Sequence, residues 1–167
     1  MDSLAHDKPI TILPMRSFPV IKDLVTDVSW NYKVNRKIPA FKPRPGTDWR
    51  IMQEDVDRVQ EFRKCIECFL CQDVCHVLRE HHLHDRFIGP RLLVYTAALE
   101  MHPLDVEDRL GDLKDSQGIG YCNITKCCTK VCPEGITITD NAIIPLKERV
   151  VDEFYDPLKR LLRVFRK

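Results

Sequence analysis

Apolar residues recur at helical spacing along most of the chain, and short segments rich in proline, glycine or polar residues separate these stretches. In an amphipathic helix the buried side chains repeat every three or four positions. This pattern predicts helices over residues 19–36, 54–64, 72–84, 89–101 and 140–153, the last with Pro145 inside it, and a weaker helix over residues 105–115 that Gly111 interrupts. The core is therefore expected to be helical.

The segments between these helices are expected to be extended or irregular. Residues 9–15 combine β-branched side chains with flanking prolines, which predicts one brief strand without a partner. Residues 38–47 hold three prolines and one glycine, which predicts a linker that wraps over the surface, and residues 117–120 predict a loop. The last nine residues, 159–167, together with Leu158, form a basic amphipathic end, which lies either against anionic lipid headgroups or a partner subunit, or in solvent as an ordinary terminal helix.

Composition and charge exclude several classes of protein. A formal net charge of +1 gives no general attraction to nucleic acid. The longest stretch without Asp, Glu, Lys or Arg is the ten residues 116–125, whereas a membrane-spanning helix needs roughly 18 apolar residues. The first residues include Asp2, Asp7 and Lys8, where a secretory signal would need an unbroken apolar core. We therefore expect a reducing compartment, in which clustered cysteines indicate metal binding before disulfides.

All eight cysteines lie between Cys65 and Cys132. The first four, at positions 65, 68, 71 and 75, follow the spacing C-x2-C-x2-C-x3-C of bacterial iron–sulfur ferredoxins. In that arrangement three thiolates hold one cluster and the fourth serves another. A zinc ribbon would instead separate two C-x2-C pairs by a loop. A zinc-binding structural or interaction module remains the alternative from another functional class.

The second run of cysteines follows the same spacing when it is aligned backward from Cys132. Cysteines are then required at positions 128, 125 and 122, and two are present, but position 125 is Thr. Because the last cysteine of each run serves the other cluster, one site receives four thiolates and suits [4Fe–4S], while the other receives three and suits [3Fe–4S]. The first set is Cys65, Cys68, Cys71 and Cys132, and the second set is Cys75, Cys122 and Cys128.

Other polar or reactive residues near these runs have simpler interpretations. Cys127 is out of register and adjacent to Cys128, so we expect it to be a small buried packing residue. Arg63 and Lys64 precede the first cluster cysteine, where they either raise the reduction potential of the cluster or cap a solvated helix face. A solvated helix end, rather than a metal or proton-transfer site, is expected at His81, His82 and His84.

Three separate motifs carry a resemblance to a known family: CIECFLCQDVC at residues 65–75, FIGPR at 87–91, and CNITKCCTKVCPEGI at 122–136. Together they resemble the carboxy-terminal domain of the iron–sulfur subunits of succinate dehydrogenases and fumarate reductases. The resemblance extends from about Ile10 to the carboxyl end. It implies an all-α fold, an α-helical two-cluster ferredoxin domain over residues 19–167 with a short extended N-terminal segment.

The chain departs from this family's pattern before the first run. The family usually begins with a plant-type [2Fe–2S] domain, yet no cysteine precedes Cys65. Residues 1–18 are therefore expected to be the remnant strand and connection of a missing domain, so that the chain supplies no [2Fe–2S] ligands. A truncated or late-start reading frame would explain this.

A second departure concerns the quinone pocket. In many members of the family that the chain resembles, a proline and tryptophans follow the last cysteine of the first run, and a histidine follows the first cysteine of the second. Here these places hold other residues, so the pocket near Cys75 and Cys122 is expected to be altered. The quinone-proximal residues are then His76, Glu80, Asn123 and Thr125.

The resemblance implies an electron-transfer subunit that relays single electrons between an FAD-containing dicarboxylate subunit and a membrane quinone, for which we expect menaquinone. A membrane anchor subunit is the other implied partner, with the chain peripheral on the cytoplasmic face of the bacterial plasma membrane and the flavin site on another chain. The nearest alternative is an iron–sulfur subunit of a heterodisulfide reductase-like or glycolate oxidase-like enzyme. Thr125 argues against it, because those families usually keep both runs complete. The direction, succinate oxidation or fumarate reduction, is left open.

Overall fold

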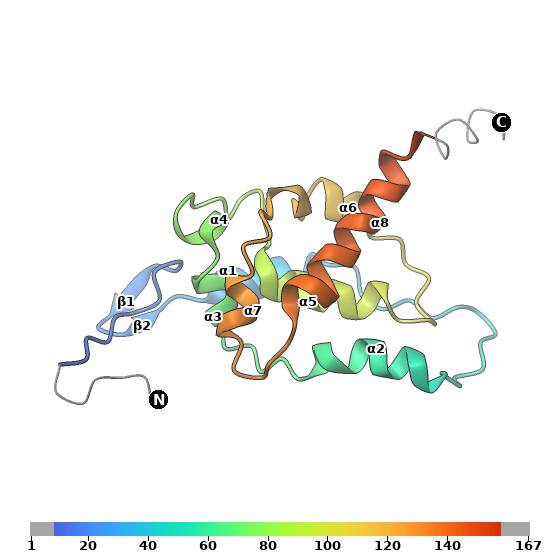
Figure 1. Cartoon of the computed structure of the whole chain (residues 1–167), viewed down its shortest axis with the longest axis horizontal. Helices are drawn as coiled ribbons and strands as arrows, with labels where there is room; N and C mark the ends of the chain where they lie inside the picture. The colour runs from blue at the N-terminus through green and yellow to red at the C-terminus, as the bar shows by residue number, and fades with distance from the viewer. Residues whose placement is uncertain (1–8, 158–167) are drawn as a thin grey trace.

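The computed structural model describes residues 9–157, and most of its regular structure is helical (Figure 1). The helices are α1 (Ser29–Asn35), α2 (Gln53–Arg63), α3 (Leu70–Asp73), α4 (His76–Arg79), α5 (Gly89–Glu100), α6 (Leu110–Lys114), the 3₁₀ turn η1 (Ile119–Tyr121), α7 (Cys127–Val131), the π-helical η2 (Ile138–Ile143) and α8 (Ile144–Phe154). The strands β1 (Val20–Lys22) and β2 (Val25–Thr26) form a two-stranded sheet. The chain is thus mainly helical, and this small sheet departs from the all-α expectation.

Helix α5 lies at the centre of the core. It packs against α2, α3 and η2, while α8 continues directly from η2 and packs against α6 (Figure 1). Leu93 and Ala97 of α5 are fully buried, as are Ala142 of η2 and Leu146 of α8. Because burying one large apolar side chain stabilises the fold by about 1.5–3 kcal/mol, these contacts fix α5 and η2 relative to each other. The predicted helices over residues 54–64 and 89–101 correspond to α2 and α5.

The segment expected to begin a helix at residue 19 instead forms a hairpin that projects from the body (Figure 1). Lys22 lies opposite Val25, so the turn between the strands has two residues. Asp23 in this turn has a φ of 52°, a left-handed conformation that Asp tolerates better than most residues. The helix predicted over residues 19–36 is therefore wrong before Ser29, because β-branched residues there favour extended backbone. The apolar residues that suggested a helix are more than half exposed, namely Val20, Ile21, Leu24 and Val25.

The N-terminal segment is anchored on α3. Residues 9–15, expected to be a brief strand, have no regular structure. The backbone N–H groups of Arg16 and Ser17 donate to Asp73 Oδ1 at 2.6 and 2.9 Å. The Ser17 hydroxyl donates to Gln72 O at 3.2 Å. These contacts fix the chain beside the first cysteine run.

The helix expected over residues 72–84 is broken in two. Helix α3 ends at Asp73, α4 begins at His76, and Cys75 between them has extended backbone with φ −71° and ψ 118°. In an unbroken helix, side chains four positions apart lie on the same face, so Cys71 and Cys75 would point together. The break allows these two cysteines to face different parts of the interior.

The linker predicted over residues 38–47 lies against the chain that leads into α6. Val106 N donates to Lys42 O at 3.0 Å. Arg44 N donates to Leu104 O at 3.1 Å. The segment contains no helix, since its prolines lack the N–H groups a helix needs. The prediction of a wrapping linker is confirmed.

Arg109 joins this linker to the core. Its side chain is fully buried and pairs with Glu100 at 3.3 Å and with Asp105 at 2.9 Å. The guanidinium also donates to two linker carbonyls, at 2.9 and 2.8 Å. Because these contacts require non-helical backbone before Arg109, the helix expected over residues 105–115 is limited to α6.

The helix expected over residues 140–153 has two parts, η2 and α8. The two parts are continuous, so Pro145 lies inside one helical stretch, as expected, in the first turn of α8 and directly after the π-helical η2. Residues 158–167, which include the whole predicted basic amphipathic end, lie outside the described residues. No helix within residues 9–157 is long and apolar enough to cross a membrane.

Gly89 opens α5 in a position that only glycine fits. Its φ is 81°, and a Cβ there would overlap Gln72 Oε1 and lie 2.7 Å from Leu78 Cδ1. Gln72 is fully buried and its amide donates to Asn31 Oδ1 and Ile88 O, both at 3.0 Å. Moving this amide aside would break those hydrogen bonds.

Gly89→Ala is expected to lower the free energy of unfolding by about 2–4 kcal/mol, because left-handed strain adds to overpacking. Gly111→Ala is the matched control, since Gly111 lies in α6 with no atom within 4 Å of an added Cβ. We expect the control to gain up to about 1 kcal/mol, because alanine favours helix. Denaturant unfolding of both variants checks this, and equal stabilities would contradict it.

Candidate functional site

The first of two hollows that contain cysteines lies between the first cysteine run, α5 and the segment after α7. Its cysteines are Cys65, Cys68, Cys71 and Cys132. Apolar walls come from Phe69, Val94, Ile136 and Ile138, among others. Arg91 and Glu134 are its charged lining residues. The four cysteines are the set for which the spacing predicts [4Fe–4S].

The second hollow lies where α4, α7 and η2 meet. Its cysteines are Cys75, Cys122, Cys127 and Cys128, and its polar lining residues are Asn123, Thr125, Lys126 and Thr139. Cys128 Sγ lies 3.4 Å from Thr139 Oγ1. Cys75, Cys122 and Cys128 are the set for which the spacing predicts [3Fe–4S]. Within residues 9–157, no three His, Cys, Asp or Glu side chains converge on the position of a single metal ion.

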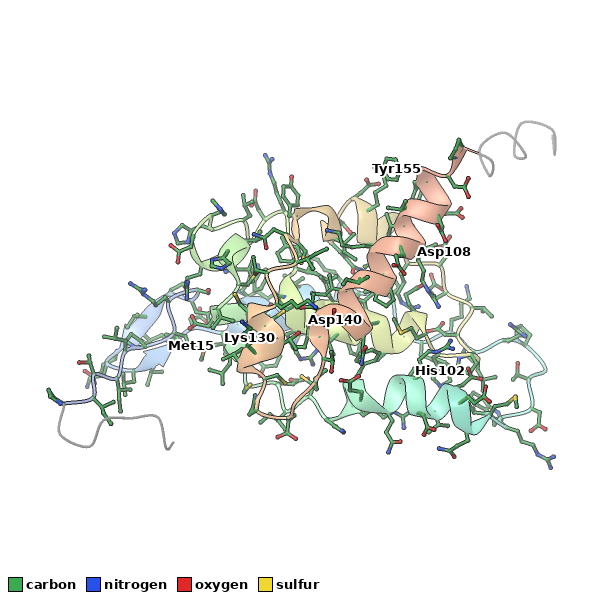
Figure 2. All side chains as sticks on the ribbon, viewed as in Figure 1. Met15, His102, Asp108, Lys130, Asp140 and Tyr155 are labelled. Atoms are coloured by element: carbon green, nitrogen blue, oxygen red, sulfur yellow. The ribbon has the colours of Figure 1, made fainter. Side chains whose placement is uncertain are left out.

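Polar contacts hold the second run against the C-terminal helices. Lys147 Nζ of α8 donates to Cys122 O at 2.6 Å. Lys126 pairs at 2.7 Å with Asp140 of η2, which is labelled in Figure 2. The loop that contains the second run is therefore fixed at two points.

The two runs share one backbone conformation. In the first run Glu67 and Phe69 have φ values of 58° and 59°. In the second run Ile124 and Lys126 have φ values of 58° and 61°. In each run these two residues stand two and four positions after the first cysteine, which is Cys65 in the first run and Cys122 in the second. Loops of this kind form backbone concavities that bind anions, and many iron–sulfur sites use them.

The repetition continues to the end of each run. The short helices α3 and α7 follow the left-handed residues, and each run ends on a cysteine with extended backbone. Cys75 has φ −71° and ψ 118°, and Cys132 has φ −66° and ψ 116°. In this repeat Thr125 occupies the backbone place that Cys68 takes in the first run.

Burial determines the protonation of the most enclosed cysteines. It raises the pKa of Cys71, and neighbouring thiols, that of Cys128 first, raise it further. Burial also raises the pKa of Cys75 and of Cys128, while a hydrogen bond with Thr139 acts in the opposite direction on Cys128. These thiols are protonated near neutral pH unless a bound metal displaces their protons. The two hollows are adjacent, because α3, which contains Cys71, packs against α7, which contains Cys128.

Known proteins share this arrangement in sequence and structure. Residues 61–136 match the family described as a 4Fe-4S dicluster domain. The succinate dehydrogenase iron-sulfur subunit of Bacillus subtilis is 28% identical over 141 residues, 80% of this chain and 54% of that protein. The fumarate reductase iron-sulfur subunit of Mycobacterium tuberculosis is 31% identical over 139 residues, 77% of this chain and 54% of that protein.

A chain in the structure of the Mycobacterium smegmatis Sdh1 complex in the apo form is 57% identical and has a TM-score of 0.89. The match covers 93% of this chain and 67% of that chain. This chain belongs to the iron–sulfur subunits of succinate dehydrogenases and fumarate reductases.

Membership in this iron–sulfur subunit family confirms the prediction made from the three motifs. The chain spans about half the length of the curated relatives it matches. The dicluster segment includes both cysteine runs, which supports iron–sulfur clusters in the two hollows.

Three of the four residues expected near a quinone in this family lie at the second hollow. Asn123 and Thr125 line it. His76 reaches its edge through Cys127, whose Sγ lies 3.5 Å from His76 Nε2. Glu80 is not among the lining residues. It pairs with Arg79 at 2.7 Å, and this hydrogen-bonded ion pair lowers the pKa of Glu80.

The histidine patch is not uniformly solvated. His81 and His82 are exposed, but His84 is half-buried with its ring centroid 4.8 Å from that of Trp30. Burial lowers the pKa of His84. The expectation of a solvated helix end is therefore wrong for His84, because Trp30 of α1 covers it.

Arg91 and Thr139 line the hollows but were not predicted as site residues from the sequence. Arg91 lies in the first hollow and is the last residue of the FIGPR motif, which carried the resemblance without assigning a role to this side chain. Thr139 lies in the second hollow, between Cys128 and Thr129, whose Oγ1 is 3.1 Å away. No spacing rule connects Thr139 with the cysteines, so only the packing of η2 on α7 reveals it.

Proposed function

We propose that this chain is an electron-transfer component of a succinate dehydrogenase or fumarate reductase complex, carrying single electrons between a flavoprotein and a membrane quinone. One observation carries the proposal. Each of two hollows is lined by four cysteines, but in the second hollow Cys127 is out of register with the repeat, and Thr125 stands where the repeat calls for the fourth ligand. This distribution supports one [4Fe–4S] and one [3Fe–4S] cluster.

The donor set of each hollow fits the cluster assigned to it. The [4Fe–4S] ligands are Cys65, Cys68, Cys71 and Cys132, and the [3Fe–4S] ligands are Cys75, Cys122 and Cys128. Thiolates are the ligands such clusters use, and the left-handed loops suit an anionic group. When bound, the clusters supply reversible one-electron chemistry. The chain holds their ligands in place, and Phe69, Val94 and Ile136 exclude water from the first hollow.

The proposed partners follow from the relatives, which are named as iron–sulfur subunits of succinate dehydrogenase and fumarate reductase. They are an FAD-containing dicarboxylate subunit, which carries the oxidation site, and a membrane anchor subunit. A quinone, which we propose to be menaquinone, binds near His76, Asn123 and Thr125. The chain is then peripheral on the cytoplasmic face of the plasma membrane.

Iron and sulfide analysis of the anaerobically reconstituted full chain tests the cluster content. We expect about seven irons and about eight sulfides per chain, because the ligand sets hold one four-iron and one three-iron cluster. EPR of the oxidised protein is expected to show the three-iron signal. About eight irons without that signal would refute the [3Fe–4S] assignment, and zinc without sulfide would refute the proposed function.

A further inference from the structure

The first hollow contains a buried cation. Arg91 stands in the first turn of α5, lines the hollow with its four cysteines, and is only 7% exposed. Burying a charged side chain costs several kcal/mol unless ion pairs and hydrogen bonds compensate it. The hydrogen-bond partners of the guanidinium N–H groups of Arg91 therefore indicate what this side chain binds.

One Arg91 donor has no partner. The guanidinium pairs through Nη2 with Glu67, which belongs to the loop between Cys65 and Cys68. The guanidinium carbon lies 5.8 Å from the centroid of the Tyr95 ring. Arg91 Nε is buried and has no hydrogen-bond acceptor among the described residues. A buried N–H without an acceptor is destabilising, which favours an acceptor belonging to the bound group.

We infer that Arg91 Nε–H donates a hydrogen bond to a sulfur atom of the [4Fe–4S] cluster and thereby raises the cluster's reduction potential. This inference rests on the proposed function, because it needs a cluster in the first hollow. The four cysteines supply sulfur acceptors around Arg91. Reduction adds one negative charge to the cluster, so a buried cation and a hydrogen bond favour the reduced form.

The other charged side chains near the first hollow are more exposed than Arg91, so we assign the effect on the reduction potential to Arg91. The Glu67 side chain is 45% exposed, so water screens its charge more than that of the buried guanidinium. Glu134, the other carboxylate of the hollow, is exposed. Arg63, two positions before Cys65, is also exposed and serves as a matched control cation.

The test is a potentiometric titration of the reconstituted full chain, followed by EPR of the reduced [4Fe–4S] cluster. In Arg91→Met we expect the reduction equilibrium to fall about tenfold, which corresponds to about 59 mV for one electron. At the wild-type midpoint the reduced fraction then falls from one half to about one tenth. The [3Fe–4S] midpoint is expected to stay unchanged, and Arg63→Met is expected to move neither midpoint appreciably.

A spectroscopic readout detects an arginine donor without any substitution, and one conservative variant assigns it to Arg91. In the unchanged chain labelled with ¹⁵N-arginine, electron-nuclear double resonance of the reduced cluster is expected to show a coupled arginine nitrogen and an exchangeable proton. Arg91→Lys keeps the charge but lacks Nε–H, so this coupling is expected to disappear while the potential falls less than in Arg91→Met.

The outcomes separate the inference from the proposed function. Absence of any [4Fe–4S] signal in the unchanged chain refutes the proposed function itself. A full [4Fe–4S] signal without arginine coupling, or with an unchanged midpoint in Arg91→Met, overturns the inference alone. If Arg91→Met fails to retain the cluster, the labelled wild-type chain and Arg91→Lys decide the question.

Discussion

Replacing Cys128 with alanine is expected to remove the three-iron cluster, whereas replacing the adjacent Cys127 is expected to leave both clusters in place. Cys128 is 8% exposed, and its loss leaves the second hollow with two ligand thiolates, those of Cys75 and Cys122. Because a bound cluster is part of the folded core, we expect local unfolding of α7 and η2 as well. Iron analysis of Cys128→Ala is expected to give about four irons per chain, and EPR no three-iron signal.

Cys127→Ala is the matched control. The Cys127 Sγ contacts are with His76 Nε2 at 3.5 Å and with Thr125 O at 3.9 Å. Their loss is expected to cost about 1 kcal/mol of stability, with about seven irons retained. If Cys127→Ala loses the cluster and Cys128→Ala keeps it, the register of the second run is wrong, and so is the assignment of Cys75 to the three-iron site.

The grouping of the cysteines was accessible from the sequence because it depends on local spacing. Each run repeats the same short stretch of backbone, and the structure places Cys132 with the first run and Cys75 with the second. The break between α3 and α4, which lets Cys75 face the second hollow, could not be predicted from the sequence. Residues 71 and 75 are four positions apart, which suits a continuous helix equally well, so the spacing does not predict the extended backbone at Cys75.

The hairpin shows where periodicity misleads. Val20, Leu24 and Val28 fall at helical spacing, but no part of the described chain buries the first two. A spacing pattern predicts a helix only if one face has something to pack against, because packing supplies most helical stability. Arg91 and Thr139 were missed for a related reason. Their positions in the hollows depend on contacts of α5 and η2 with distant cysteine loops, which no local pattern encodes.

A cysteine at position 125 is expected to convert the three-iron site into a four-iron site. Thr125 lines the second hollow and occupies the backbone place that Cys68 has in the first run. The new thiolate therefore completes a set of four, which suits [4Fe–4S]. In Thr125→Cys we expect the iron content to rise from about seven to about eight per chain, and the oxidised three-iron EPR signal to disappear.

Asn123→Cys tests whether register, rather than an additional thiol, is responsible. Asn123 lines the same hollow but stands one position after Cys122, where the first run has Ile66 instead of a ligand. We therefore expect Asn123→Cys to retain about seven irons and the three-iron signal. Conversion in both variants would show that any nearby thiol captures the fourth iron. Conversion in neither would refute the backward alignment from Cys132, because the repeated backbone would then have no bearing on how many irons the second site holds.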